Sequence, residues 1–293
     1  MPEVIEVSIA TRYGDVEAEE KLLDGSSPTS RSLLFLHGGA ANLRSWDGVI
    51  RHLNHRCLAI DLPGHGKTTI DPMPFDQLDD LLRDVVQSMA DRKPVVIGHS
   101  FGGLAAVAAG ALSGDLYGGV IAVDPPMSNA EIRYHHDTLD SALQELRDME
   151  WPWPGVSDLD TEVERVVASM APREDMAQVR EMVRRGYRKQ NDGIYIRFPR
   201  REDEIKGVQA NWSIDVDDAY GSVSCPLAIA LAGADGVHRF RNHDIDTRRK
   251  LTESLSQDRP VEFQVFDCGH DIPGYQSCEL ALFISQWLSG LDA

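Results

Sequence analysis

The chain has 293 residues, of which 42% are hydrophobic and 26% charged, as in ordinary globular proteins. This length suits a single α/β core that carries an inserted segment. Asp and Glu total 47 and Lys and Arg total 29, so the formal net charge is -18, which repels phosphate backbones and anionic lipid surfaces. The composition therefore argues against nucleic-acid and membrane partners.

The N-terminus and the cysteines indicate a protein of the cytoplasm. The first residues are acidic and alternate polar with apolar, and no window of about 18 residues is continuously apolar, so neither an export signal nor a membrane span is predicted. The 4 cysteines lack any CxxC spacing, and no HxxxH or HExxH pattern occurs. We expect free thiols in a reducing cytoplasm and no metal site. The cysteines are Cys57, Cys225, Cys268 and Cys278.

The first half of the chain alternates strand patterns with helix patterns. Residues 4–9 and 16–22 alternate apolar and polar side chains and predict a β-hairpin that turns at Gly14-Asp15. Short apolar runs, typical of strands buried on both faces, follow at 32–36, 57–60, 95–97 and 120–123. Helical spacing of apolar residues occurs at 43–53, 75–89 and 104–112. This order predicts a mostly parallel sheet flanked by helices, in which ligands bind beyond the carboxyl ends of the strands.

The alternation stops after Pro126 and resumes near residue 216. Three amphipathic helical stripes lie between these points, at 139–149, 163–170 and 176–183. Strand patterns return at 226–231 and 261–266, and helical patterns at 246–255 and 278–288. We therefore predict one α/β core, residues 1–126 and 216–293, with residues 127–215 inserted as a helical cap.

Gly98-His99-Ser100-Phe101-Gly102 is a GxSxG sequence in the context that gives the pattern meaning. An apolar strand leads into it and a helix of small residues, starting at Gly103, leads out. A serine in such a strained turn is exposed at the sheet edge, and the flanking glycines let strand and helix approach closely. The context predicts Ser100 as a catalytic nucleophile.

A serine hydroxyl is a weak nucleophile unless an imidazole removes its proton during attack. His270, in Cys268-Gly269-His270-Asp271, directly follows the last predicted strand, so its loop opens at the same sheet edge as Ser100. We predict His270 as the general base. Attack on a carbonyl also needs donors for the developing oxyanion, and we assign these to the backbone N–H groups of Gly39 and Phe101.

Four motifs together resemble the α/β-hydrolase superfamily: HGG at 37–39, DLPGHGKT at 61–68, GHSFGG at 98–103 and GH at 269–270. The resemblance implies an eight-stranded sheet, a helical cap inserted after the sixth strand, and a Ser–His–acid triad that needs no cofactor. Within that pattern the segment 61–68 has a structural role. The fold alone does not name a substrate.

The sequence offers two acids for the triad. Asp124 ends the strand pattern at 120–123 and stands before Pro125-Pro126, which resembles relatives whose acid follows the sixth strand. Asp235 follows the seventh strand, the commoner location, but the usual spacing of glycine, two residues and aspartate would reach position 236 here. Rigid placement before two prolines favours Asp124, and Asp235 stays open as the alternative.

The reaction expected from these residues is hydrolysis of an ester, lactone or related acyl bond of a small organic substrate through an acyl-enzyme on Ser100. Alternatives are a carbon–carbon hydrolase or thioesterase, a lyase, acyltransferase or pathway cyclase on the same fold, and a protein that only binds ligand. The oligomeric state is not predicted. Candidate substrate-binding residues are His37, Met127, Tyr134, Trp151 and Trp153.

Overall fold

The computed structural model describes most of the chain. The described residues are 3–22, 31–89, 93–133, 136–150, 155–170, 173, 175–233, 245–258 and 260–291. Within these ranges, no helix combines the length and the apolar character needed to cross a membrane.

Eight strands of the described chain form one sheet in the order β1-β2-β4-β3-β5-β6-β9-β10. Strands β1 and β2 form an antiparallel hairpin, β2 is antiparallel to β4, and all the other neighbours are parallel. The predicted mostly parallel eight-stranded sheet is thus confirmed. The strands are β1 (Glu3–Thr11), β2 (Gly14–Leu22), β3 (Leu33–Leu36), β4 (Cys57–Ile60), β5 (Val95–His99), β6 (Gly119–Val123), β9 (Leu227–Ala232) and β10 (Val261–Phe266).

The central strands are apolar throughout because helices cover both faces of the sheet. Alternate side chains of β3 face opposite cores: Leu34 and Leu36 pack into one, and Leu33 and Phe35 into the other. The first core lies under α2 (Phe75–Ser88), α3 (Phe101–Ser113), α9 (Val216–Ser222) and α10 (Ile245–Asp258). The second lies under η1 (Leu43–Trp46), α1 (Asp47–Ile50), α11 (Ile272–Tyr275) and α12 (Ser277–Leu291). The single helix expected at 43–53 is shorter, since it ends at Ile50.

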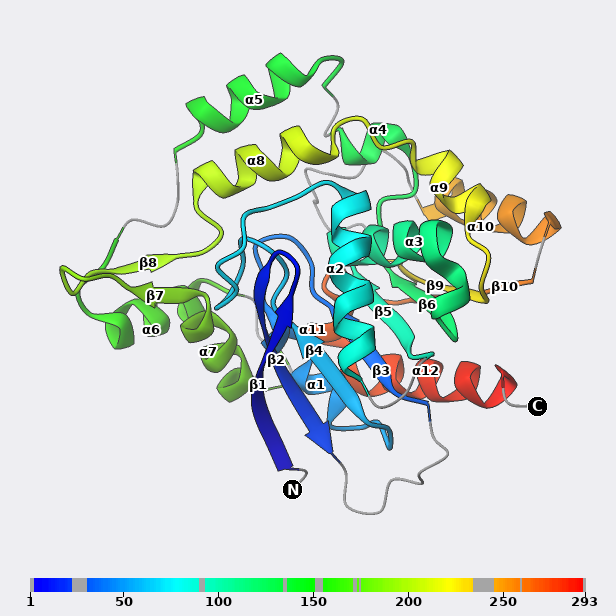
Figure 1. The fold of residues 1–293 in the computed structure, drawn as a ribbon, viewed down its shortest axis with the longest axis horizontal. Coiled ribbons are helices and arrows are strands. Elements are labelled where there is room, and N and C mark those ends of the chain that lie inside the picture. The colour runs from blue at the N-terminus through cyan, green and yellow to red at the C-terminus, as the bar shows by residue number, and fades with distance from the viewer. Residues whose placement is uncertain are drawn as a thin grey trace.

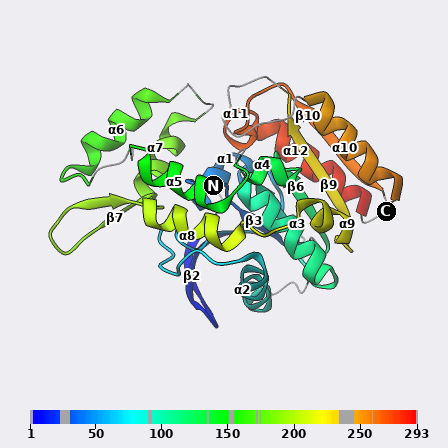
Figure 2. The same ribbon diagram turned by 90° about the horizontal axis from the view of Figure 1, so that it is seen from above.

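Residues 127–215, which follow β6, form a group of elements beside the sheet (Figures 1 and 2). Helix α5 packs along α8. Both helices lie above the sheet, at the end where strand β5 finishes (Figure 1). The segment also holds a short antiparallel pair, β7 with β8, in addition to the expected helices. Its elements are α4 (Asn129–Ile132), α5 (Leu139–Asp148), α6 (Leu159–Ser169), α7 (Met176–Arg185), β7 (Tyr187–Lys189), β8 (Tyr195–Arg197) and α8 (Arg201–Asn211).

A buried ionic cluster joins this segment to the sheet. The guanidinium of Arg185, at the end of α7, donates from Nε to Asp61 Oδ2 at 3.0 Å and from Nη1 to Glu19 Oε1 at 3.1 Å. The side chains of Arg185, Asp61 and Glu19 are 5%, 0% and 1% exposed. Asp61 also accepts hydrogen bonds from the backbone N–H groups of Leu43 and Lys67. The segment 61–68 is therefore held from several sides.

We expect Arg185→Met to lower the free energy of unfolding by about 3–5 kcal/mol, because two buried carboxylates would lose their shared cation. Urea denaturation followed by circular dichroism measures the change. Arg180→Met on the same helix is the matched control, since Arg180 forms an exposed ion pair with Glu164. Equal losses for the two variants would contradict a stabilising role for the buried cluster.

Candidate active site

Ser100 occupies the turn between β5 and α3 in a strained conformation. Its φ is 54° and its ψ is -119°, a region that non-glycine residues rarely adopt. The backbone N–H of Ser100 donates to the Val123 carbonyl at 2.8 Å, and its carbonyl accepts from Leu104 N–H at 3.1 Å. The turn is thus tied both to the neighbouring strand β6 and to the first turn of α3.

Glycines allow this turn to be so tight. A Cβ atom on Gly98 would overlap the carbonyl of Gly102, and one on Gly102 would overlap the carbonyls of His37 and Leu36. Strand β5, helix α3 and the loop after β3 therefore approach more closely than any larger residue permits.

Ser100, His270 and Asp124 form a continuous hydrogen-bonded series. His270 lies in the loop between β10 and α11, and its Nε2 is 2.9 Å from Ser100 Oγ. Its Nδ1 is 2.5 Å from Asp124 Oδ2, beyond the end of β6. Because a carboxylate only accepts hydrogen bonds, Nδ1 carries a proton, which leaves the lone pair of Nε2 facing the serine hydroxyl. In this arrangement His270 is placed to act as a base on the hydroxyl of Ser100, the candidate nucleophile.

Asp124 is held rigidly by groups that sequence reasoning did not identify. Its Oδ1 accepts from the Arg248 guanidinium at 2.5 Å and from Ala232 N–H at 2.9 Å. The Asp124 side chain is 0% exposed and that of Arg248, on α10, is 3% exposed. A buried cation beside a carboxylate favours its ionised form, which is the form able to accept the His270 proton contact.

His99 also contributes to the position of His270. Its Nε2–H donates to the backbone carbonyl of His270 at 2.9 Å, and the two rings lie 4.7 Å apart between centroids. Burial lowers the pKa of His99 to about 4, so its ring is neutral at pH 7. The middle residue of the Gly98-to-Ser100 turn is thus a neutral donor that fixes the loop carrying His270.

Backbone strain gathers at this same place. The described non-glycine residues with positive φ are Ala40, Ser100 and Asp124, at 56°, 54° and 44°. All three line one cavity, together with His270. Strained residues persist only where the surrounding structure fixes them, and they cluster at functional sites.

That cavity, of about 510 Å³, lies between the sheet and the segment inserted between β6 and β9. The core side contributes residues 38–42, Ser45, residues 99–101, residues 124–126, Arg248, His270 and Asp271. The inserted segment contributes a wall in which three methionines stand among charged groups such as Arg173 and Arg197. Methionine side chains adapt to ligands of different shape. Those methionines are Met149, Met170 and Met182.

The two residues assigned as oxyanion donors lie in this cavity. Gly39 follows β3 and Phe101 is the first residue of α3, and both line the space around Ser100. The N–H groups in the first turn of a helix have no partner within the helix, so that of Phe101 is available to an anion.

Two expected substrate-binding residues require correction. His37 is 0% exposed, its Nδ1–H donates to the Gly38 carbonyl at 2.7 Å, and its Nε2 accepts from Leu62 N–H at 2.9 Å. Both ring nitrogens are therefore used to join two loops under the site. Met127 is 3% exposed and packs in the core, with its backbone N–H on the Glu131 carboxylate at 2.6 Å. Neither side chain lines the cavity, because each is enclosed by the scaffold.

The other candidates lie outside the described residues. These are Tyr134, Trp151 and Trp153 among the substrate-binding residues, and Asp235 as the alternative acid. The contact with His270 Nδ1 is therefore described for Asp124, and the two candidate acids are not compared by the structure.

Three buried histidines should make the protein sensitive to acid. Burial lowers the pKa of His37 to about 4 and that of His65 to about 3, and His99 behaves like His37. Between pH about 6.5 and about 4 the unfolded chain binds protons that the folded chain does not. The free energy of unfolding therefore falls as pH falls, by up to about 1.4 kcal/mol per pH unit for each such histidine.

Urea unfolding at pH 7, 6, 5 and 4.5 tests this expectation. His65→Asn keeps a side-chain N–H for the Pro63 carbonyl that His65 Nδ1 contacts at 2.9 Å. We expect the free energy of unfolding of this variant to fall less steeply with falling pH than that of the parent chain, by the contribution of one buried histidine. A variant whose slope equals that of the parent chain would contradict the buried neutral state of His65.

Comparison with known proteins places the chain among related sequences. The family model described as "Alpha/beta hydrolase family" matches residues 33–281. An esterase from Mycobacterium tuberculosis is 29% identical over 252 residues, which cover 80% of each chain. A 2-succinyl-6-hydroxy-2,4-cyclohexadiene-1-carboxylate synthase from Salmonella agona is 40% identical over 85 residues, 28% of this chain and 33% of the synthase.

Solved structures show the same fold at low sequence identity. A thioesterase domain from the curacin biosynthetic pathway superposes with a TM-score of 0.75 at 16% identity, covering 97% of this chain and 99% of its own. E-2-(acetamidomethylene)succinate hydrolase gives 0.75 at 18% identity, covering 98% and 100%. The Mycobacterium tuberculosis esterase gives 0.71 at 22% identity, covering 99% and 92%.

Proposed function

Because the chain belongs to the alpha/beta hydrolase family, we propose that it is a serine esterase, which cleaves a carboxylic ester or lactone of a small organic molecule through an acyl-enzyme. One observation carries the proposal: the hydrogen-bonded series from Ser100 through His270 to Asp124 at the floor of a cavity. The esterase that shares 29% identity over 80% of both chains supports the reaction class.

The first half of the proposed reaction forms the acyl-enzyme. As Ser100 Oγ attacks the ester carbonyl carbon, its proton passes to His270 Nε2. Asp124 stabilises the resulting imidazolium through the Nδ1 contact, and the N–H groups of Gly39 and Phe101 receive the negative charge on the carbonyl oxygen. When the carbon–oxygen bond breaks, His270 returns the proton to the leaving alcohol.

The second half releases the acid. A water molecule takes the place of the alcohol, His270 removes its proton, and the hydroxide adds to the acyl carbon. Collapse of this intermediate breaks the bond to Ser100 Oγ, which recovers its proton from His270. The products are a carboxylic acid and an alcohol, and the protein returns to its starting state.

We further propose that residues 127–215 act as a cap over this chemistry. The cavity has one wall from the core and one from this segment, so a substrate there would be enclosed between them. Exclusion of water strengthens the contacts that stabilise the developing charge. Localisation in the cytoplasm stays a prediction from the sequence.

Labelling with a fluorophosphonate probe, followed by peptide mass spectrometry, tests the proposal. We expect a covalent adduct on Ser100. Ser45 lines the same cavity, but its hydroxyl has no hydrogen-bond partner among the described residues, so it provides an internal control that should stay unlabelled. Labelling of neither serine, or of both equally, would contradict an activated nucleophile at Ser100.

A lyase reaction is the second candidate, because of the 40% identity to the synthase over 85 residues. In that case His270 acts as an acid and base on a bound substrate while Ser100 forms no acyl intermediate. The two candidates differ in one measurement. A burst of p-nitrophenol before steady turnover of a p-nitrophenyl ester indicates an acyl-enzyme and supports the esterase.

A further inference from the structure

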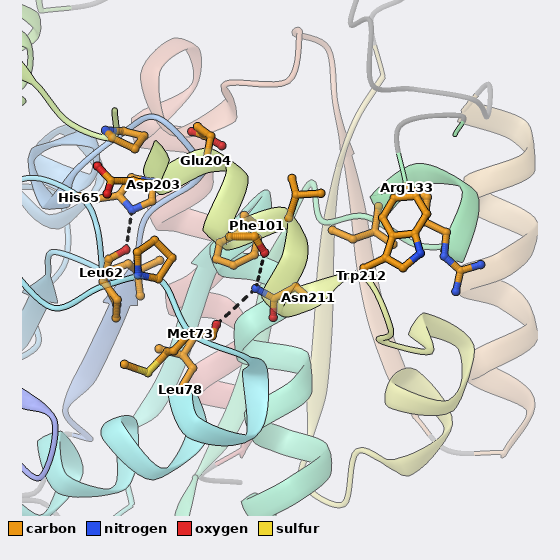
Figure 3. Close-up of a pocket in the computed structure, with 17 residues that line it drawn as sticks. Leu62, His65, Met73, Leu78, Phe101, Arg133, Asp203, Glu204, Asn211 and Trp212 are labelled. Atoms are coloured by element: carbon orange, nitrogen blue, oxygen red, sulfur yellow. Dashed lines mark hydrogen bonds between the residues drawn. The ribbon is translucent and has the colours of Figure 1, made fainter. Parts of the chain in front are cut away.

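A second, smaller cavity of about 80 Å³, drawn in Figure 3, has lining residues in common with the cavity at the candidate active site. It lies between the loop 62–73, the start of α2 and helix α8, which crosses in front of the Phe101 ring in this view (Figure 3). We call it the side pocket. It shares lining residues with the large cavity, namely Gly39, Phe101, Ile132, Glu204 and Val208.

The walls of the side pocket are mainly apolar. They are formed by Leu62, Pro63, Pro72, Met73, Leu78, Phe101, Ile132, Val208 and Trp212. Among its polar residues, burial lowers the pKa of His65 to about 3, so this imidazole is neutral, and Asp203 is already paired with Arg200 at 3.0 Å. A carboxylate in the pocket would meet the negative charges of Asp203 and Glu204, and Arg133, a cation that also lines the pocket, lies with its guanidinium 5.9 Å from the centroid of the Trp212 ring. The lining therefore suits an uncharged aliphatic group.

The shape of the side pocket is fixed by contacts between its walls. The Phe101 ring stacks on Phe75 with 5.4 Å between centroids. Asn211, near the end of α8, donates from Nδ2 to the Met73 carbonyl at 3.3 Å, which ties the helix to the loop (Figure 3). A pocket held in this way is preformed, so a ligand entering it loses little free energy to ordering of the protein.

The position of the side pocket relative to the reacting groups decides which half of an ester it receives. The leaving oxygen must lie near His270, because that residue protonates it. His270, Asp271 and Arg248 line the large cavity and do not line the side pocket. The side pocket instead shares with the large cavity Gly39 and Phe101, whose N–H groups are the assigned donors for the carbonyl oxygen. The part of the ester that extends from the carbonyl carbon away from His270 is the acyl chain, so the side pocket is placed to receive that chain.

We propose that the side pocket is an acyl-chain subsite that selects short, uncharged aliphatic acyl groups, while the larger cavity receives the alcohol. The inference rests on the proposed esterase function and deepens it. The side pocket has a volume of about 80 Å³, roughly one sixth of the 510 Å³ of the large cavity, and this small volume limits the length of the acyl chain that it can hold.

Gly207 offers a direct test, because it lines the side pocket from α8 and does not line the large cavity. A Cβ atom at this position would meet only Pro72 Cβ within 4 Å, at 3.9 Å, among the described residues. A larger side chain can therefore grow into the pocket without displacing backbone. Alanine and leucine also favour helix over glycine, so both variants should fold.

The experiment compares kcat/KM for p-nitrophenyl acetate, butyrate, hexanoate and octanoate. We expect the wild type to prefer butyrate or hexanoate to acetate. Gly207→Leu should lower the hexanoate-to-acetate ratio by about tenfold, the equivalent of losing the burial of roughly two methylene groups. Gly207→Ala should give a smaller change in the same direction. Gln209→Leu, which adds the same apolar side chain at an exposed position of α8, is the matched control and should keep the wild-type ratio.

A second series fixes the acyl group as acetate and lengthens the alcohol from ethyl to hexyl. Here we expect Gly207→Leu to leave the order of preference as in the wild type. An unchanged acyl-length ratio in Gly207→Leu, or a shift in the alcohol series instead, would overturn the acyl subsite. If the wild type hydrolyses none of these esters and Ser100 takes no fluorophosphonate, the proposed function itself fails, and this outcome is distinct from the other two.

Discussion

Replacement of Ser100 by alanine should lower kcat for an activated short-chain ester by at least about a thousandfold, because members of a triad act as a unit. Without the hydroxyl, the lone pair of His270 Nε2 faces no nucleophile, and only the oxyanion donors and the binding of substrate remain. The residual rate should not show a burst of the alcohol product. Stopped-flow absorbance with p-nitrophenyl butyrate measures both the rate and the burst.

The variant should fold as well as the parent chain. Ser100 has an unfavourable φ of 54° in either case, and the removed hydroxyl contacts only His270 in the described structure. Ser285→Ala is the control: its hydroxyl donates to the Ala281 carbonyl within α12, far from the cavity in sequence and fold. If Ser100→Ala keeps more than about a tenth of the wild-type kcat while Ser285→Ala is unaffected, Ser100 is not the nucleophile.

The sequence was most informative where local pattern and chain direction act together. Apolar runs such as 57–60 and 120–123 correspond to β4 and β6, because strands buried on both faces must be continuously apolar. The same pattern predicted that the functional site lies at the carboxyl edge of the sheet, because parallel strands bring the residues after β5, β6 and β10 together. Ser100, Asp124 and His270 lie there, with His270 within hydrogen-bonding distance of each of the other two.

Local sequence patterns did not predict contacts between segments that are distant in the chain. Arg248 lies on α10, 124 positions after the Asp124 that it contacts, and nothing in the helix sequence distinguishes it from its exposed neighbour Arg249. His37 presented the opposite difficulty. Its place beside the Gly38-Gly39 turn suggested a contact with substrate, but both of its ring nitrogens are engaged by the backbone. Only tertiary packing determines which polar side chain faces a cavity.

The inserted segment shows a related limit of helical periodicity. The predicted helical stripe at 139–149 contributes Ala142, Leu146 and Met149 to the wall of the large cavity at the candidate active site. The stripes at 163–170 and 176–183 likewise each contribute to that cavity, through Met170 and Met182. Periodicity identifies the apolar face of a helix but not whether that face covers other side chains or a space for ligand.

Replacement of Asp124 by asparagine should lower kcat for the same ester by roughly 10³–10⁴-fold. The amide has the shape of the carboxylate, so its oxygen still accepts from Arg248 and Ala232 N–H. Its nitrogen would then occupy the place of Oδ2, 2.5 Å from His270 Nδ1. Because that nitrogen only donates, His270 must carry its proton on Nε2 instead, and the base that faces Ser100 is lost. The loss should appear in kcat far more than in KM.

The comparison with Asp235→Asn distinguishes the two acids. We expect that variant to keep kcat within a fewfold of the wild type, since the His270 Nδ1 contact is made by Asp124. Both variants need a thermal melt, because Asp124→Asn leaves the buried Arg248 with a weaker partner and should lower the melting temperature. Activity is therefore compared well below both melting points. If Asp235→Asn is crippled there while Asp124→Asn retains activity, the acid is Asp235, and the Asp124 carboxylate serves to bind Arg248 and the end of β9 rather than to orient the imidazole.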